Sequence, residues 1–147
     1  MFTHILVPVD GSELSNRVVA RAVEFAREIG AKITGFYVQP EYSVPYYEGG
    51  MPLDAMTPES FAELTGNQAK KILSFVEDNA RAEGVPCEVV TSVNDAPYEA
   101  IIQVATERGC DLIFMASHGR RGIAGLLMGS ETHKVLTHTT IPVLVYR

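Results

Sequence analysis

The sequence predicts an α/β fold in which a parallel sheet lies between two layers of helices. Short apolar runs of strand length alternate with amphipathic segments of helix length. The alternation continues along the whole chain, in the order strand, helix, strand, helix, strand, helix, strand, helix, strand. Such alternation is typical of strand–helix–strand units with parallel strands. We therefore expect a three-layer α/β/α architecture with a five-stranded parallel sheet, formed as a single domain over residues 1–147.

The first three elements carry the clearest signals. Residues 5–9 form a short apolar run, which predicts a strand buried on both faces. Pro8 is expected near the end of this strand, because proline cannot donate to a strand ladder. Ser12 is expected to cap a helix that Gly30 ends, since apolar residues recur every three or four positions between them. Residues 32–38 are rich in β-branched and aromatic side chains and predict a second strand.

The segment from residue 39 to residue 57 follows no hydrophobic period and contains three prolines and three tyrosines. Connections of this length are usually functional or disordered. Its tyrosines could let it fold over a ligand or a partner subunit, and a mobile surface loop is the alternative.

The remaining elements follow from caps and apolar patterns. Thr57 and Pro58 form a good helix start, and Gly84 is expected to end that helix. Asp95, together with Pro97, is expected to open the third helix, and Ser130 is expected to cap the fourth. The expected ranges are 87–93, 112–116 and 141–146 for strands three to five, and 97–109 and 130–137 for the last two helices.

Composition excludes several classes of protein. A hydrophobic share of 46% and a charged share of 20% are typical of a globular protein. The formal net charge of −6 argues against nucleic-acid binding, which needs a broad basic surface. Cys87 and Cys110 match no zinc or redox spacing, so both are expected to be reduced. The start carries no signal-peptide pattern and no apolar run reaches membrane-spanning length, so we expect a cytoplasmic protein without membrane insertion.

The segment from Asp111 to Val135 reads as a strand, a glycine-rich loop and a helix start. Glycines allow backbone N–H groups to turn toward a ligand, and the first turn of a helix leaves N–H groups unpaired. Arg120 and Arg121 add positive charge in an acidic chain. The segment therefore suits a phosphate group, although an ordinary mobile loop followed by a helix cap would have the same glycine content.

A parallel sheet binds ligands at the carboxyl ends of its strands, where the strand order reverses. If the first and fourth strands flank that point, Asp10 faces the glycine-rich loop across one crevice. Asp10 could then accept hydrogen bonds from ribose hydroxyls or hold a phosphate-bound Mg²⁺, and capping of the following helix is the alternative role. The sequence contains neither the P-loop motif nor the dinucleotide-binding glycine motif, which argues against both of those classes.

Three stretches together resemble the universal stress protein family: ILVPVDGS at residues 5–12, MASHGRRGIAGLLMGS at residues 115–130 and IPVLVYR at residues 141–147. Members of that family that bind ATP carry G-x-x-G, nine residues, then G-[ST]. In this chain the pattern falls on Ala116 to Gly119 and on Gly129 with Ser130. Ala116 stands where the first glycine is expected, which adds one methyl group at the end of an extended strand.

The resemblance implies a nucleotide-binding, Rossmann-like fold with strand order 3-2-1-4-5. It also implies that the backbone around Val9 and Val38 holds adenine, that Asp10 contacts the ribose, and that the glycine-rich loop holds the phosphates. The nucleotide-binding residues expected on this basis are Pro8, Val9, Asp10, Val38, Met115, Ala116, His118, Gly119, Arg120, Arg121, Gly122, Gly129, Ser130, Glu131 and Thr132.

The resemblance further implies a homodimer formed through the last strand, with Ile141, Pro142, Val143, Leu144, Val145 and Tyr146 at the interface. A short apolar edge strand, whose pairing groups need a cover, agrees with that arrangement. The expected ligand is ATP, or the related ADP or AMP, with Mg²⁺ carried on the phosphates. The sequence offers no metal site of the protein's own.

The leading hypothesis is a cytoplasmic, ATP-binding homodimer that regulates a stress response through a protein partner of unknown identity. One alternative is a slow ATP hydrolase or phosphoryl-transfer enzyme, for which His118 and His133 are the histidines near the loop. No catalytic residue is identified, because neither histidine has a partner carboxylate at a suggestive spacing. The other alternative is a dimeric interaction module that binds no nucleotide; Ala116 favours it, and Gly119, Gly129 and Ser130 oppose it.

Overall fold

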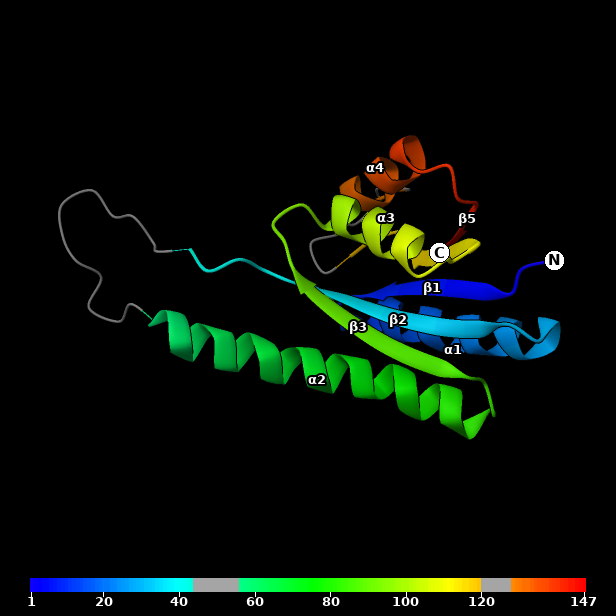
Figure 1. Cartoon of the computed structure of the whole chain (residues 1–147), viewed down its shortest axis with the longest axis horizontal. Coiled ribbons are helices and arrows are strands. Elements are labelled where there is room, and N and C mark those ends of the chain that lie inside the picture. Colours follow the sequence, from blue (N-terminus) through cyan, green and yellow to red (C-terminus); the bar gives the residue numbers. More distant parts are fainter. Residues whose placement is uncertain (44–55, 120–127) are drawn as a thin grey trace.

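A computed structural model of the chain describes residues 1–43, 56–119 and 128–147. Strands and helices alternate through these ranges, as predicted (Figure 1). The elements are β1 (His4–Val9), α1 (Glu13–Ile29), β2 (Lys32–Gln39), α2 (Pro58–Ala82), β3 (Cys87–Val93), α3 (Pro97–Glu107), β4 (Leu112–Ala116), α4 (Ser130–His138) and β5 (Val143–Tyr146). The last strand begins two residues later than expected, because Pro142 precedes it and its pairing with β4 starts at Val143. Most of the segment 39–57 lies outside the described residues.

The five strands form one parallel sheet in the order β3-β2-β1-β4-β5, which confirms the expected topology. From β1 the chain moves outward to β2 and β3, crosses back to β4 and ends at β5. The strand order therefore reverses between β1 and β4, which pair through Ile5 with Leu112 and Leu6 with Ile113. Pro8 is the second-last residue of β1, as expected of a residue that cannot donate to the ladder.

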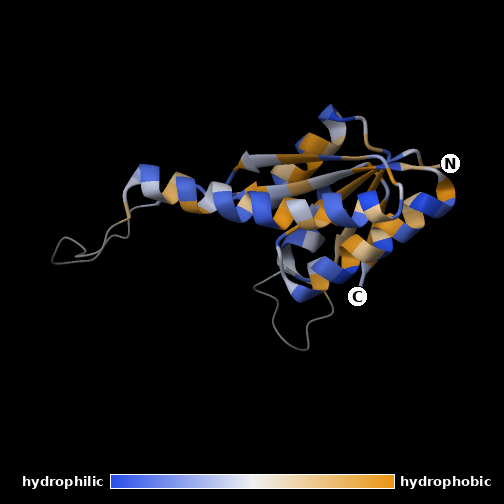
Figure 2. Cartoon of the chain, turned by 90° about the horizontal axis from the view of Figure 1, so that it is seen from below, coloured by the Kyte–Doolittle hydropathy of each residue, from blue (hydrophilic) through white to orange (hydrophobic). Residues whose placement is uncertain are grey.

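Helices cover both faces of the sheet, with α1 and α2 on one side and α3 and α4 on the other (Figure 1). Each face has its own apolar core. One core packs Val18 and Val23 of α1 and Val76 of α2 against the sheet, and the other packs Ile101 of α3 and Val135 of α4 against it. Figure 2 shows the helices striped in hydrophilic and hydrophobic colours, as expected of helices with one buried face.

Two helix starts match the sequence prediction, and the structure shows the hydrogen bonds that cap them. Ser12 caps α1, and its Oγ accepts a hydrogen bond from the Ser15 N–H at 3.1 Å. Thr57 caps α2, and its Oγ1 accepts from the Ser60 N–H at 3.1 Å, with Pro58 in the first turn. These caps are readable from sequence because donor and acceptor lie three residues apart.

The other two helices begin at Pro97 and Ser130, as predicted, but their N-cap residues differ from the prediction. Ala96, not Asp95, is the N-cap residue of α3, and Asp95 instead accepts a hydrogen bond from the Glu41 N–H at 3.1 Å. Gly129, not Ser130, is the N-cap residue of α4, and no side chain caps that helix from the N-cap position. Both of these helices begin at the carboxyl edge of the sheet, where the candidate site lies.

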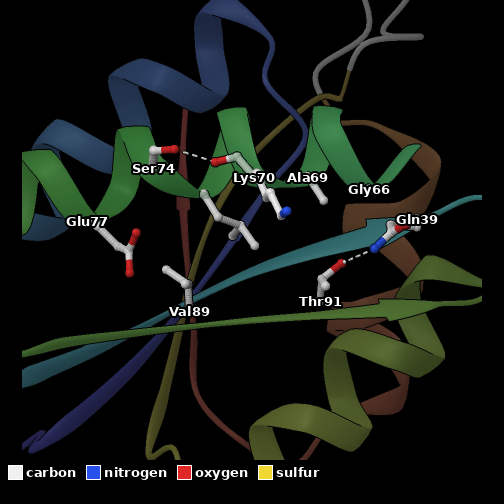
Figure 3. A pocket seen from close by; sticks show the side chains of 9 residues that line it. Gln39, Gly66, Ala69, Lys70, Ser74, Glu77, Val89 and Thr91 are labelled. Carbon is white, nitrogen blue, oxygen red and sulfur yellow. Dashed lines mark hydrogen bonds between the residues drawn. The ribbon is translucent and has the colours of Figure 1, made fainter. Parts of the chain in front are cut away.

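Helix α2 packs closely on β2 and leaves a groove of about 430 Å³ beside β3 (Figure 3). Ala69 and Lys70 of α2 and Val89 and Thr91 of β3 are among the residues that line the groove. The close approach is possible because Gly35 of β2 has no side chain: a Cβ there would lie 2.8 Å from Cγ1 of Val76. Gly35 thus sets the spacing between α2 and the sheet.

Candidate functional site

A pocket of about 610 Å³ opens at the carboxyl ends of the strands, where the strand order reverses. Its walls come from the ends of β1, β2 and β4, from the segment between β3 and α3, and from the first turn of α4. This is the location at which parallel sheets of this type bind their ligands. The volume is within the range of small-molecule sites.

Twelve of the residues expected at a nucleotide site line this pocket. They are Pro8, Val9, Asp10, Val38, Met115, Ala116, His118, Gly119, Gly129, Ser130, Glu131 and Thr132. Arg120, Arg121 and Gly122, also expected at the site, lie outside the described residues. The fold therefore brings together three segments that are far apart in the sequence. Their role in nucleotide binding stays a prediction.

Sequence reasoning missed a further group of pocket residues. Ser15, Phe36, Tyr37, Pro40, Asn94, Asp95, Pro97 and Ile101 also line the pocket. Half of this group follows β3, whose carboxyl end lies at the same edge of the sheet as those of β1 and β4. A signal was present in the sequence, because Asn94 and Asp95 form a polar turn directly after a predicted strand.

A network of hydrogen bonds shapes the turn after β1. Oδ1 of Asp10 accepts from the Ser12 N–H at 2.9 Å, and the Asp10 N–H donates to Oγ of the buried Ser15 at 3.1 Å. Ser12 rather than Asp10 caps α1. The capping role considered for Asp10 therefore belongs to Ser12, and the Asp10 carboxylate is held in the pocket wall by the turn.

Two glycines in the pocket wall lie so close to their neighbours that an added side chain would be crowded. A Cβ on Gly119 would lie 2.9 Å from Oδ2 of Asp10. A Cβ on Gly129 would lie 3.1 Å from the Ser117 carbonyl oxygen, to which the Gly129 N–H already donates a hydrogen bond at 2.6 Å. The wall is thus closely packed at both positions, against the Asp10 side chain at Gly119 and against the Ser117 backbone at Gly129.

The N-terminus of α4 faces the pocket with free backbone donors. The first hydrogen bond within α4 runs from the His133 N–H to the Gly129 carbonyl oxygen at 3.0 Å. The N–H groups of Ser130, Glu131 and Thr132 come before it and have no acceptor within the helix. All three residues line the pocket, so the helix presents partial positive charge to whatever occupies it.

The Thr132 hydroxyl has a structural task. Thr132 is 3% exposed, and its Oγ1 donates to the Ala116 carbonyl oxygen at 2.9 Å and to that of Ser117 at 3.2 Å. The single hydroxyl proton of Thr132 is therefore donated to carbonyl oxygens at the end of β4. Because a phosphate can only accept hydrogen bonds, Thr132 can contribute its backbone N–H but not its hydroxyl. The side chain instead fixes the first turn of α4 against the strand that ends at the pocket.

Glu131 joins the starts of two helices. One of its carboxylate oxygens accepts from the Tyr98 N–H of α3 at 3.0 Å, and the other accepts from Nζ of Lys134 at 3.2 Å. Since α3 has no side-chain cap of its own, this carboxylate takes the place of one. The N-terminus of α3 is thus already supplied with an anion, whereas that of α4 remains open.

Of the two histidines near the loop, His118 lines the pocket and its Nδ1 lies 2.9 Å from Oγ of the buried Ser117. His133 is exposed on α4 and is not among the described lining residues. Across the described ranges, no group of three or more His, Cys, Asp or Glu side chains is arranged to hold a metal ion.

Ala116 ends β4 and is half-buried in the pocket wall. Its backbone belongs to the parallel ladder, where it pairs with Tyr146 of β5. Alanine adopts this extended conformation freely, so the change from the expected glycine requires no backbone adjustment.

Comparison with known proteins identifies the family. The family model described as "Universal stress protein family" matches residues 1–147. The chain is 32% identical to the universal stress protein YxiE of Bacillus subtilis, with the whole of both chains covered. It is also 32% identical over 148 residues to a universal stress protein of Thermus aquaticus, again covering both chains completely. Within the described ranges, none of the helices has the length and apolar content needed to cross a membrane.

Solved structures show the same fold. A universal stress protein in complex with cAMP matches with a TM-score of 0.71 and 28% identity, covering 99% of this chain and 97% of the other. A family protein of Arabidopsis thaliana with AMP bound matches with a TM-score of 0.67 and 21% identity, covering 97% and 90%. A universal stress protein of Archaeoglobus fulgidus in complex with dAMP matches with a TM-score of 0.64 and 23% identity, covering 100% and 98%. The chain belongs to the universal stress protein family.

Proposed function

We propose that this chain binds an adenine nucleotide, ATP in particular, in the pocket at the carboxyl edge of the sheet, and that it acts as a homodimeric, cytoplasmic regulator of a stress response. Family membership and the relatives whose structures contain cAMP, AMP or dAMP support the adenine nucleotide. Mg²⁺ would be carried on the phosphates. A protein partner would distinguish the nucleotide-bound protein from the nucleotide-free protein.

The observation that carries this proposal is the open N-terminus of α4. Three N–H groups without an acceptor in the helix line the pocket, and Gly129 before them offers no capping side chain. Such an end attracts a phosphate through hydrogen bonds and through the helix dipole. The glycine positions support the same assignment, because a Cβ at Gly119 or Gly129 would crowd the wall at this end of the pocket.

Other residues of the pocket wall suit a base and a ribose. Val9 and Val38 at the ends of β1 and β2 provide apolar surface, with Ile101 of α3 nearby in the wall. Asp10, whose Oδ1 is fixed by the turn, directly follows Val9, and its Oδ2 lies close to Gly119. We assign the apolar region to adenine and the Asp10 carboxylate to the ribose hydroxyls.

One substitution removes a phosphate donor and leaves the fold undisturbed. Ser130 is the first residue of α4, a position at which proline is readily accepted. Gly129 before it has φ −73° and ψ 158°, the extended conformation that proline requires of its predecessor. Ser130→Pro therefore deletes the Ser130 N–H along with the hydroxyl, while Ser130→Ala deletes only the hydroxyl.

Calorimetric titration of both variants with ATP and with adenosine tests the proposal. We expect Ser130→Pro to weaken ATP binding about tenfold, the value of one hydrogen bond to a charged acceptor, and to leave adenosine binding unchanged. Ser130→Ala separates the contribution of the hydroxyl from that of the N–H. If Ser130→Pro binds ATP as tightly as the wild type while circular dichroism shows a native fold, the phosphate assignment is wrong.

The homodimer is proposed to form through β5. This strand lies at one edge of the sheet, pairs with β4 on its inner side, and keeps all four residues partly exposed in the single chain. Ile141 and Pro142 directly precede it and extend the proposed interface. A lysine on an edge strand opposes strand pairing, so Val145→Lys is expected to convert dimer to monomer in analytical ultracentrifugation. A monomeric wild type, or a Val145→Lys variant that stays dimeric, would exclude this interface.

A further inference from the structure

Strand β3 lies at the edge of the sheet opposite β5, and within the described ranges it pairs with β2 alone. The Ile33 N–H donates to the Pro86 carbonyl oxygen at 2.9 Å, and the Asn94 N–H donates to the Gln39 carbonyl oxygen at 3.0 Å. Because backbone groups alternate in direction along a strand, the even-numbered residues of β3 point theirs toward β2 and the odd-numbered residues point theirs outward. Four residues of β3 therefore present an N–H and a C=O to the free edge: Cys87, Val89, Thr91 and Val93.

This edge lacks the features that usually prevent strand pairing, which are lysine, proline or a bulge on the edge strand. Strand β3 contains neither lysine nor proline, and its register with β2 is uninterrupted. Its one charged side chain, Glu88, is already paired with Arg108 at 3.1 Å. Val93, although apolar, is 59% exposed. The edge is therefore open to a further strand.

The side of α2 above this edge carries two opposite charges, Lys70 and Glu77, and both side chains line the groove between α2 and β3 (Figure 3). Within the described residues neither of them belongs to an ion pair, whereas Asp78 on the same helix is paired with Arg81. The two charges are about two helical turns apart, or ~10 Å along the helix. A groove with one charge at each end is complementary to a copy of itself turned through 180°.

The midpoint of these two charges lies level with Val90 of β3. A Cβ on Gly35 would lie 2.8 Å from Cγ1 of Val76 and 3.3 Å from Cγ1 of Val89, so these two valines are at the same height. The midpoint comes about two to three residues before Val76, or ~4 Å along the helix. Because α2 runs antiparallel to β3, this displacement corresponds to about one strand residue beyond Val89 (Figure 1).

A two-fold axis through Val90, perpendicular to the sheet, gives a consistent strand pairing. Val89 then lies opposite Thr91 of the second copy, and both residues point their backbone groups outward, so an antiparallel ladder can form. Glu88 lies opposite Ser92 of the second copy, so no like charges meet across the strands. The sheet would continue from one copy into the other.

The same axis places the two α2 helices side by side and antiparallel. Because Val76 of α2 lies over both β2 and β3, the axis of α2 is about two strand spacings, ~10 Å, from its symmetry copy. Helices pack against each other at about this distance. Lys70 of each copy would then lie opposite Glu77 of the other, with the small Ser74 near the centre of the contact.

We infer that a second copy of this chain docks on the β3 edge, with the two β3 strands antiparallel and two Lys70–Glu77 ion pairs between the α2 helices. Since β5 lies at the other edge of the sheet, both contacts can form together and join β5-linked dimers into larger species. The β3 contact is the weaker of the two, because its ion pairs are near the surface and its strand contains the polar residues Thr91 and Ser92.

Sedimentation velocity from micromolar to sub-millimolar protein, without nucleotide, tests this interface. The wild type should form species larger than the dimer at the highest concentrations. Lys70→Glu and Glu77→Lys each place like charges opposite each other at two symmetric positions, so each should weaken this association about tenfold. The double exchange should restore it. Lys71→Glu is the matched control, because Lys71 is an exposed neighbour that is not among the described groove residues, and it should associate as the wild type does.

Two more variants separate the strand contact from the β5 contact. Val93→Lys puts a lysine on the exposed end of β3 and should also prevent the larger species. Val145→Lys, which blocks β5, should self-associate only at the highest concentrations, and Lys70→Glu should suppress that association. A wild type that forms nothing larger than the dimer at sub-millimolar concentration would overturn the inference. A double exchange that fails to restore what the single exchanges lose would overturn it as well.

Discussion

Replacement of Gly35 by alanine should destabilise the protein, because α2 packs directly over this position. Gly35 lies in β2, where it pairs with Val7 of β1 and Val89 of β3. A Cβ there would lie 2.8 Å from Cγ1 of Val76, 3.2 Å from Cβ of the same residue and 3.3 Å from Cγ1 of Val89. Val76 is 1% exposed and β-branched, so it has little freedom to turn aside.

Overpacking of this kind typically costs about 1–3 kcal/mol, and we expect Gly35→Ala to lower the free energy of unfolding by that amount. Gly66→Ala is the matched control, since Gly66 lies inside α2 and a Cβ added there would have nothing within 4 Å. That change should instead stabilise the protein by about 0.5–1 kcal/mol, because alanine favours the helix.

Urea denaturation followed by circular dichroism measures both changes. Truncation of Val76 opens the space that the new methyl group needs, so Gly35→Ala and Val76→Ala should be strongly non-additive when combined. Two results would refute the close packing of α2 on β2 at the spacing the structure shows. One is a Gly35→Ala variant as stable as the wild type, and the other is a double variant that loses the full sum of the two single losses.

Three further predictions concern single groups. Thr132→Val should lower the free energy of unfolding by about 1–3 kcal/mol in urea titrations, because it leaves the Ala116 carbonyl without the hydroxyl that bonds to it. Burial, with a smaller contribution from the Lys32 charge, lowers the pKa of His4 below 6.5, so the unfolded chain binds this proton more readily. The contribution of neutral His4 to the free energy of unfolding is therefore present above pH 6.5 and is lost as the pH falls through the pKa of the folded state. In thermal melts, the His4→Gln variant should show a weaker dependence of stability on pH. Burial raises the pKa of the Cys110 thiol to about 11, so Cys110 should react with a thiol reagent at about pH 8 far more slowly than in urea-unfolded protein.

Each of these predictions has its own control. Ser74→Ala on the exposed side of α2 should cost much less than Thr132→Val, and equal losses would contradict the role given to Thr132. A His4→Gln variant whose stability falls with pH as steeply as that of the wild type would contradict the burial argument. Rapid labelling of folded Cys110 would show that its pKa is not raised.

The architecture was predictable because its signals are local or periodic. The Ser12 and Thr57 caps act across three residues, and the strand and helix periods are visible along the chain. The topology followed from the alternation and from the resemblance to the family. The starts of α3 and α4 were predicted correctly, but the group that caps α3 was not, because it is Glu131, 33 residues away in the sequence.

The candidate site was predictable only in part for the same reason. The glycine-rich loop and the Asp10 turn are visible along the sequence, whereas Asn94 and Asp95 reach the pocket through the tertiary arrangement of β3 and α3. Thr132 shows a second limit of prediction from the sequence. A threonine after Gly129 and Ser130 fits a phosphate motif, yet its hydroxyl binds the end of β4, an arrangement set by how α4 packs rather than by sequence spacing.

The central claim is that the pocket between β1, β4 and α4 holds an adenine nucleotide, and equilibrium dialysis of the nucleotide-free protein against labelled ATP with Mg²⁺ tests it most directly. We predict saturable binding of one nucleotide per chain, displaced by unlabelled AMP and weakened by Ser130→Pro. Absence of binding to the folded wild type, with ATP and with labelled AMP alike, would contradict the claim and favour a dimeric interaction module that needs no nucleotide.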